Sequence, residues 1–186
     1  MHGRAGSGKS TLLDLIAGRR QATEGTLRLG DTIHIGYLDQ HTDAFDQGKG
    51  LDRKVIEFVE EAASRIDLGG EQVTASQLLE RFLFPPAQQH SPLSKLSGGE
   101  RRRLTLCRML VQAPNVLLLD EPMAGAGSEE SQHMIDIIDR VRGQAGILLI
   151  EHDMDAVFRL ADRVTVLVEG AVIASGTPTE ISANRD

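Results

Sequence analysis

The chain has 186 residues, of which 40% are hydrophobic, and its formal net charge is −7. This length suffices for one domain with its own core, and the acidic balance disfavours a general nucleic-acid binder, so no direct DNA binding is expected. No apolar run approaches the ~18 residues of a membrane helix and no export signal is seen, so we do not expect the chain to span a membrane. Cys107 is the single cysteine, which excludes an internal disulfide and is typical of a cytoplasmic protein.

The first motif is a glycine-rich phosphate-binding loop. Residues 3–10 read GRAGSGKS, and the following TLLDLIAGRR predicts a helix whose N-terminus faces an anion. In such a loop backbone N–H groups point at phosphate oxygens, Lys9 reaches the β- and γ-phosphates, and Ser10 ligates Mg²⁺. The alternative is a Gly/Ser turn that caps a helix. A loop of this kind normally follows a buried strand of about five or six residues, and here only Met1 and His2 precede it.

Apolar runs and helical patterns alternate along much of the chain, which predicts an α/β fold with helices on a parallel sheet. Buried parallel strands are expected at 116–119, 147–150 and 164–168, helices at 128–142 and 154–161, a strand pair at 26–29 and 32–37, and a hairpin at Gly170 leading to 172–174. Residues 50–112 differ, because they show two amphipathic helical stripes (51–66 and 78–83) and no strand signal. We expect them to form a helical subdomain inserted into the α/β layer.

An apolar strand that ends in two carboxylates supplies a second nucleotide-binding element. The residues VLLLDEP place Asp120 and Glu121 at the carboxyl edge of the sheet, where ligands of open α/β sheets bind. Asp120 is suited to hold Mg²⁺ through water, and Glu121 to polarise the water that attacks a γ-phosphate. The alternative is a pair of solvated turn carboxylates.

The segment LSGGE provides a second anion-binding helix start. Ser97 is expected to cap the next helix, and Gly98 and Gly99 free the backbone N–H groups at its first turn. One chain does not need two γ-phosphate sites, so the second is expected to serve the nucleotide of a partner. The alternative is a capped helix whose Glu100 and following arginines (101–103) form a solvated or internally paired face.

These elements together resemble one superfamily. The ordered set GRAGSGKST, Gln40, LSGGE, LLLDEP and His152 is similar to the Walker A loop, Q-loop, signature, Walker B and switch histidine of ABC ATPase domains. The resemblance implies an ABC-type P-loop NTPase fold, with a parallel sheet flanked by helices and a helical subdomain, spanning 1–186 as one domain. It also implies a head-to-tail dimer that holds ATP between Walker A of one chain and the signature of the other.

The residues and the resemblance together define a candidate site. The nucleotide contacts are Gly3, Arg4, Ala5, Gly6, Ser7, Gly8, Lys9, Ser10, Thr11, Gln40, Ser97, Gly98, Gly99 and Glu100; the metal contacts are Ser10, Gln40 and Asp120; and the catalytic residues are Lys9, Glu121 and His152. The resemblance implies that Gln40 approaches Mg²⁺ and the attacking water, and that His152 contacts the γ-phosphate. Without the other motifs, His152 is an ordinary histidine at a strand end.

The resemblance changes at the Walker B element. Up to Pro122, sequence segments such as IGYLDQ and LSKLSGGERRRL resemble those of ABC-F ATPases, which act on ribosomes. From Met123 onward, MAGAGSEES and LLIEHDMDAVFRLADRVTVLVEG resemble ATPase subunits of branched-chain amino-acid importers. We interpret the chain as a mosaic of the two.

Three departures from the family pattern bear on function. The family has a β-rich segment and a strand before Walker A, and in this sequence only Met1 and His2 precede the motif, so the adenine-stacking residue is unassigned. Without that strand we expect several apolar side chains to be exposed, at a cost of ~1.5–3 kcal/mol each. The total stability of a domain is only ~5–15 kcal/mol. We therefore expect an isolated chain of marginal stability. The loop 124–127 lacks the family's aspartate. A single ATPase domain must pair with a second one.

The function expected from the sequence is Mg²⁺-dependent ATP hydrolysis that powers transport or ribosome remodelling. The partners are a second ABC ATPase domain and either a membrane permease subunit or the ribosome, with a cytoplasmic location that includes the inner face of the membrane. The alternative is a truncated, non-catalytic nucleotide-binding or docking module.

Overall fold

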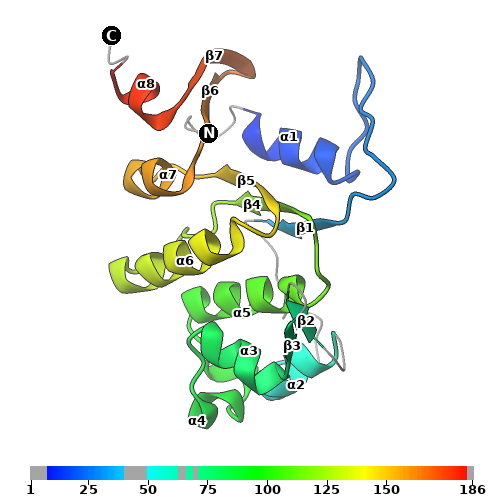
Figure 1. The fold of residues 1–186 in the computed structure, drawn as a ribbon, viewed down its shortest axis with the longest axis vertical. Helices are drawn as coiled ribbons and strands as arrows, with labels where there is room; N and C mark the ends of the chain where they lie inside the picture. The colour runs from blue at the N-terminus through cyan, green and yellow to red at the C-terminus, as the bar shows by residue number, and fades with distance from the viewer. Residues whose placement is uncertain (1–7, 40–49, 63–65, 69–70, 184–186) are drawn as a thin grey trace.

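The computed structural model describes residues 8–39, 50–62, 66–68 and 71–183 (Figure 1). The elements in chain order are α1 (Lys9–Ile16), β1 (Ile35–Leu38), α2 (Val55–Glu60), β2 (Ile66–Leu68), β3 (Glu71–Val73), α3 (Ala75–Arg81), α4 (Pro86–Gln89), the 3-10 helix η1 (Leu93–Lys95), α5 (Gly98–Leu110), β4 (Val116–Asp120), α6 (Ser128–Val141), β5 (Gly146–Ile150), α7 (Met154–Leu160), β6 (Val164–Val168), β7 (Ala171–Gly176) and α8 (Pro178–Ala183). Within these ranges no helix combines the length and apolarity that crossing a bilayer requires.

A parallel sheet in the order β1-β4-β5 forms the centre of the molecule. In its register Leu118 of β4 lies between Tyr37 of β1 and Leu148 of β5. Strand β4 is apolar at every position before Asp120 because both of its faces are covered, as is usual for parallel strands. The expected strands at 116–119 and 147–150 are thus confirmed, and their carboxyl ends meet at one edge of the sheet.

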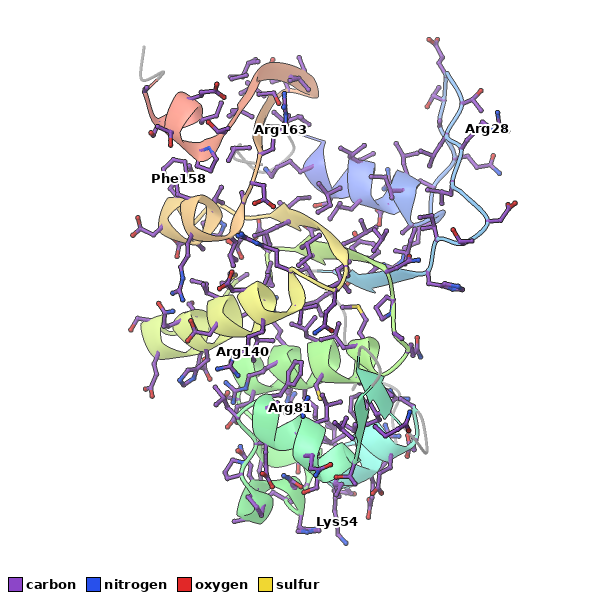
Figure 2. The ribbon with its side chains drawn as sticks, in the orientation of Figure 1. Arg28, Lys54, Arg81, Arg140, Phe158 and Arg163 are labelled. Carbon is purple, nitrogen blue, oxygen red and sulfur yellow. The ribbon has the colours of Figure 1, made fainter. Side chains whose placement is uncertain are left out.

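Helices cover the two faces of this sheet. Figure 1 shows α1 on one face and α5 and α6 on the other. Side chains alternate along β4, so Leu118 joins Leu13 of α1 in one apolar cluster, whereas Leu117 and Leu119 join the larger cluster formed with α5 and α6. Side chains fill the space between the sheet and this second helical layer (Figure 2). The helices expected at 128–142 and 154–161 correspond to α6 and α7.

The region 50–112 contains strands that the sequence did not predict. Helices α2 to α5 are present, but α2 ends at Glu60, and β2 and β3 form an antiparallel pair. Ile66, which fits the helical stripe, instead lies buried in β2, opposite Val73. Strands of three residues are too short to show an alternation of their own, and the spacing of apolar residues therefore favoured the helix. The boundaries of a helical subdomain at 50–112 remain a prediction.

The expectation that 164–168 joins the parallel sheet is wrong. Strand β6 pairs antiparallel with β7, and the two form a separate sheet joined by a turn at Gly170, whose φ is +80°. The hairpin itself was predicted. A cavity of about 370 Å³, lined by residues that include Leu148 of β5 and Val164 of β6, lies between these two strands. Among the described residues no strand pairs with the outer edge of β5.

The expected strand pair at 26–29 and 32–37 is also wrong. Residues 20–34 form an exposed arm, on which Figure 2 labels Arg28, and regular structure begins only at Ile35. Leu27 and Leu29 are 51% and 48% exposed, so their alternation reflects no buried face. Asn115, just before β4, fixes the end of the arm: its Oδ1 accepts a hydrogen bond from the His34 amide at 2.8 Å, and its Nδ2 donates one to Thr32 O at 2.7 Å.

Candidate functional site

The phosphate-binding loop enters the described structure at Gly8. Its φ is +86°, a left-handed conformation that glycine adopts without steric cost, and α1 begins at the next residue. Gly8 offers no side chain to cap the first N–H groups of α1, so they remain suited to an external anion. Lys9 follows and is only 8% exposed, although it carries a charge. Gly3, Arg4, Ala5, Gly6 and Ser7 lie outside the described residues.

Asp120 meets α1 at the end of β4. It is 4% exposed, and burial raises the pKa of its carboxyl group, whereas a hydrogen bond from the Ser10 hydroxyl and the charge of Lys9 lower it. A buried lysine, a hydroxyl and a buried carboxylate thus converge at the start of α1. This donor set fits a Mg²⁺-bound phosphate group, because a hard cation prefers such oxygens and the lysine complements the phosphate charge.

Glu121 follows Asp120 in a left-handed backbone conformation, with φ +49°. Its amide donates a hydrogen bond to Ile150 O at 2.9 Å, and its carbonyl accepts one from Arg102 Nη1 at 2.6 Å. A non-glycine residue in this conformation is held there by its surroundings, and such strain often occurs at functional sites. The turn directs a partly exposed carboxylate to the edge of the sheet.

His152 lies beside Glu121 at the end of the neighbouring strand. Its Nδ1 is 3.9 Å from Glu121 Oε1, and the imidazole is 63% exposed. The parallel register of β4 and β5 explains this proximity, because both residues follow the carboxyl ends of paired strands. A base and a histidine at this spacing are able to act on the same water or phosphate. The structure therefore brings together Lys9, Ser10 and Asp120 in one group and Glu121 and His152 in another.

The signature residues lie at the start of α5. Ser97 caps the helix: its Oγ accepts a hydrogen bond from the Glu100 amide at 3.1 Å, and Glu100 Oε2 accepts one from the Ser97 amide at 2.8 Å. The predicted cap is thus present. Ser97 Oγ also donates to Glu130 Oε1 of α6 at 2.7 Å, and the carboxylate of Glu130 packs against Gly99. Gly98 has open space around it.

The start of α1 and the signature at the start of α5 are not brought together within one chain. Figure 1 shows α1 and α5 on opposite sides of the sheet β1-β4-β5. Thr11 is an exposed residue of α1, and Gln40 lies outside the described residues. In the part of the chain that the structure describes, no group of three or more His, Cys, Asp or Glu residues is arranged to hold a metal ion.

The arginine run after the signature makes contacts inside the domain. Arg101 Nη2 approaches Ser94 O at 3.4 Å, Arg102 binds the Glu121 carbonyl, and Arg103 is buried with its guanidinium 5.0 Å from the ring centre of Phe84. These contacts favour an internally paired face over a solvated one.

Sequence reasoning missed Glu151, which is buried directly after β5, next to His152. Its Oε1 accepts a hydrogen bond from the Met123 amide at 2.9 Å, and its Oε2 accepts one from the His152 amide at 3.1 Å. Its position directly after the apolar strand ILLI was visible in the sequence, but nothing there indicates that its carboxylate reaches the Met123 amide. Arg102 was also missed, since nothing in a run of three arginines indicates which one contacts Glu121.

The fold and this site define a P-loop nucleotide-binding domain, with a parallel sheet, a phosphate-binding helix start and acidic residues at the strand ends. The family model described as ABC transporter matches residues 1–124. The chain belongs to this ABC transporter family, as its ATP-binding domain. The expected α/β fold of the ABC ATPase type is confirmed.

Individual relatives and a solved structure agree with this assignment. The chain is 40% identical over 173 residues to a Bacillus subtilis protein named uncharacterized ABC transporter ATP-binding protein YfmR, covering 92% of this chain and 27% of that protein. It is 33% identical to the energy-coupling factor transporter ATP-binding protein EcfA2 of Lacticaseibacillus paracasei, covering 98% of this chain and 68% of the relative. The structure of CbiO1 from Clostridium perfringens, described as part of the ABC transporter complex CbiONQ, superposes with a TM-score of 0.78 at 26% identity, covering 99% of this chain and 78% of that one.

The chain spans only part of several curated relatives, such as the 27% noted for YfmR. The family resemblance is confirmed by these matches. The division into an ABC-F-like part up to Pro122 and an importer-like part from Met123 is an interpretation of the sequence.

Proposed function

We propose that the chain binds ATP with Mg²⁺ and hydrolyses it as one half of a head-to-tail dimer. The observation that carries this proposal is the convergence of Lys9, Ser10 and Asp120 at the start of α1, beside Glu121 and His152 at the ends of β4 and β5. The placement of α1 and α5 on opposite sides of the sheet supports a dimer, because the signature must then act on the nucleotide of another chain.

In this proposal each residue of the site has a separate role. Glu121 orients and polarises the water that attacks the γ-phosphate, and His152 holds the phosphate in the geometry of the transition state. Lys9 stabilises the charge that develops on the phosphate oxygens. Mg²⁺, when held by Ser10 and Asp120, neutralises further phosphate charge. Residues 3–8, Thr11 and Gln40 complete the nucleotide and metal contacts, and the signature residues (97–100) contact the nucleotide of the partner chain.

ATP turnover measured against protein concentration tests the proposal. Turnover that rises more than linearly with concentration and requires Mg²⁺ indicates a composite site, and Glu121→Gln is expected to abolish it. The matched control is Glu24→Gln, which makes the same chemical change on the exposed arm and is expected to leave turnover unchanged. Equal turnover in wild type and Glu121→Gln contradicts the proposed role of Glu121.

The energy of hydrolysis is proposed to drive a transport assembly through a membrane permease subunit. The names of EcfA2 and of the CbiONQ complex support this choice over the ribosome. The domain then acts in the cytoplasm at the inner face of the membrane. Co-purification with a membrane protein is the expected result, whereas co-sedimentation with ribosomes instead contradicts it.

A non-catalytic nucleotide-binding or docking module is the second candidate. The observation that favours it is the cavity of about 370 Å³ beside β5, because β5 leads directly to His152. ATP binding without turnover, in both wild type and Glu121→Gln, is the result expected of such a module.

A further inference from the structure

The carboxylate of Glu151 lies between the loops that follow β4 and β5. This residue is 1% exposed, and its two oxygens accept hydrogen bonds from the amides of Met123 and His152. A buried carboxylate is costly unless such N–H groups satisfy it. Met123 and Glu151 are 28 residues apart in the sequence, so one side chain fastens together two loops that are distant along the chain.

The loop after β4 needs such support because of the conformation at Glu121. The left-handed φ of +49° is unfavourable for a glutamate and persists only where neighbouring contacts hold it. The amide of Glu121 is held by Ile150 O, and the amide of Met123, two residues further, is held by Glu151. Met123 is itself buried, so loss of the carboxylate leaves its N–H without a partner or forces the turn to move.

The same carboxylate also faces the histidine. Glu151 Oε2 is 3.9 Å from His152 Nδ1, the distance that also separates Nδ1 from Glu121 Oε1. The imidazole therefore lies within reach of both carboxylates, and its main chain is fixed by the hydrogen bond to Glu151. Glu151 is nearly inaccessible, so it is placed to act on these neighbours and not on a bound nucleotide.

We propose that Glu151 is a positioning residue for the reaction. Through the amides of Met123 and His152, it sets the spacing between the Glu121 carboxylate and the His152 imidazole. This inference rests on the ATP hydrolysis proposed above. The expected consequence is that Glu151 affects the rate of the chemical step and leaves nucleotide affinity nearly unchanged, because Lys9 and Ser10 bind phosphate independently of the loop.

The test compares Glu151→Ala, Glu151→Gln and a control. Alanine removes both hydrogen bonds, whereas glutamine keeps one acceptor oxygen and places a donor against the other amide. Asn115→Ala is the control, because it also removes two hydrogen bonds to main-chain groups but at the opposite end of β4. For each variant we would measure kcat, KM for ATP, the folded fraction, and hydrogen exchange at the amides of Met123 and His152.

The proposal expects kcat to fall by about 10–100-fold in Glu151→Ala, since small displacements of reacting groups cost rates of this order. KM is expected to change less than about threefold, Glu151→Gln to be intermediate, and Asn115→Ala to keep its rate per folded molecule. In a double-mutant cycle with His152→Ala, the effect of Glu151→Ala on kcat is expected to shrink, because the two residues act together.

Other results overturn the proposal. An unchanged kcat per folded molecule in Glu151→Ala, or a loss no larger than that of Asn115→Ala, rejects a positioning role while ATP hydrolysis stands. Absence of turnover in the wild type rejects the proposed function instead. Hydrogen exchange at the amides of Met123 and His152 then tests the contacts of Glu151 independently of turnover. Faster exchange at Met123 and His152 in Glu151→Ala supports the tether, and unchanged exchange overturns it.

Discussion

Replacing Arg102 by alanine removes the hydrogen bond that reaches from α5 to the carbonyl of Glu121. The donor is charged and the distance from Nη1 to O is 2.6 Å in a partly buried setting. Such bonds contribute about 1.5–3 kcal/mol, and partial exposure places this one near the lower end. Because about 1.4 kcal/mol corresponds to a tenfold change in rate, we expect kcat to fall by about 5–20-fold if the bond serves to hold Glu121 in place.

The assay separates this effect from a loss of stability. A loss of about 1.5 kcal/mol lowers Tm by about 3–6 °C in a domain of this size, so the folded fraction of each variant is measured at the assay temperature and kcat is expressed per folded molecule. Arg101→Ala is the matched control, because it makes the same substitution at the neighbouring arginine, whose Nη2 approaches Ser94 O at 3.4 Å. We expect the kcat of Arg101→Ala to stay within about twofold of wild type, which corresponds to a change in activation free energy of less than about 0.4 kcal/mol. If Arg102→Ala hydrolyses ATP at the wild-type rate per folded molecule, the bond does not position Glu121 and the reasoning is refuted.

Three further predictions concern stability and reactivity. A Cβ at Gly36 would lie 2.8 Å from Met109 Sδ and 3.1 Å from Leu117 Cδ2, so Gly36→Ala is expected to destabilise the fold by about 1–2 kcal/mol in urea unfolding; an unchanged midpoint contradicts this packing. Burial raises the pKa of Asp120, so the folded state binds that proton more tightly than the unfolded state, and the stability it contributes at low pH is lost as pH rises through the folded pKa. Asp120→Asn is therefore expected to raise Tm at neutral pH relative to wild type while abolishing turnover. A lower Tm at neutral pH contradicts the inference that the ionised Asp120 carboxylate destabilises the folded state. Cys107 is buried and its thiol pKa is raised by burial, so iodoacetamide is expected to label it only as fast as the domain opens; rapid labelling under native conditions contradicts that burial.

Elements with long, regular patterns were predictable from the sequence. Strands β4 and β5 are continuous apolar runs, and α6 repeats its buried residues at helical spacing, so local residue order suffices to identify them. Element pairing was less predictable. The strands β2 and β3 are only three residues long, which is too short to show a pattern of their own. Strand β6 pairs with β7 and not with the parallel sheet, and such a choice of partner depends on which strand edges lie nearby.

Short local motifs are enough to identify the chemical groups of the candidate site. A glycine-rich loop with Lys9 and Ser10, the Asp120–Glu121 pair and the Ser97 cap are local patterns, and each needs only its own few residues to be recognised. These patterns also predict phosphate and Mg²⁺ binding, because such binding requires these groups at this spacing.

The positions of these groups relative to one another depend on long-range packing. Glu121 and His152 come close because β4 and β5 are adjacent and parallel, and their register places Asp120 opposite Ile150. The same register lets Glu151 reach the Met123 amide, a contact that no pattern in either segment indicates. A hydrogen bond between distant segments depends on the packing of the whole sheet and its helices, and this packing is not encoded in the spacing of any single motif.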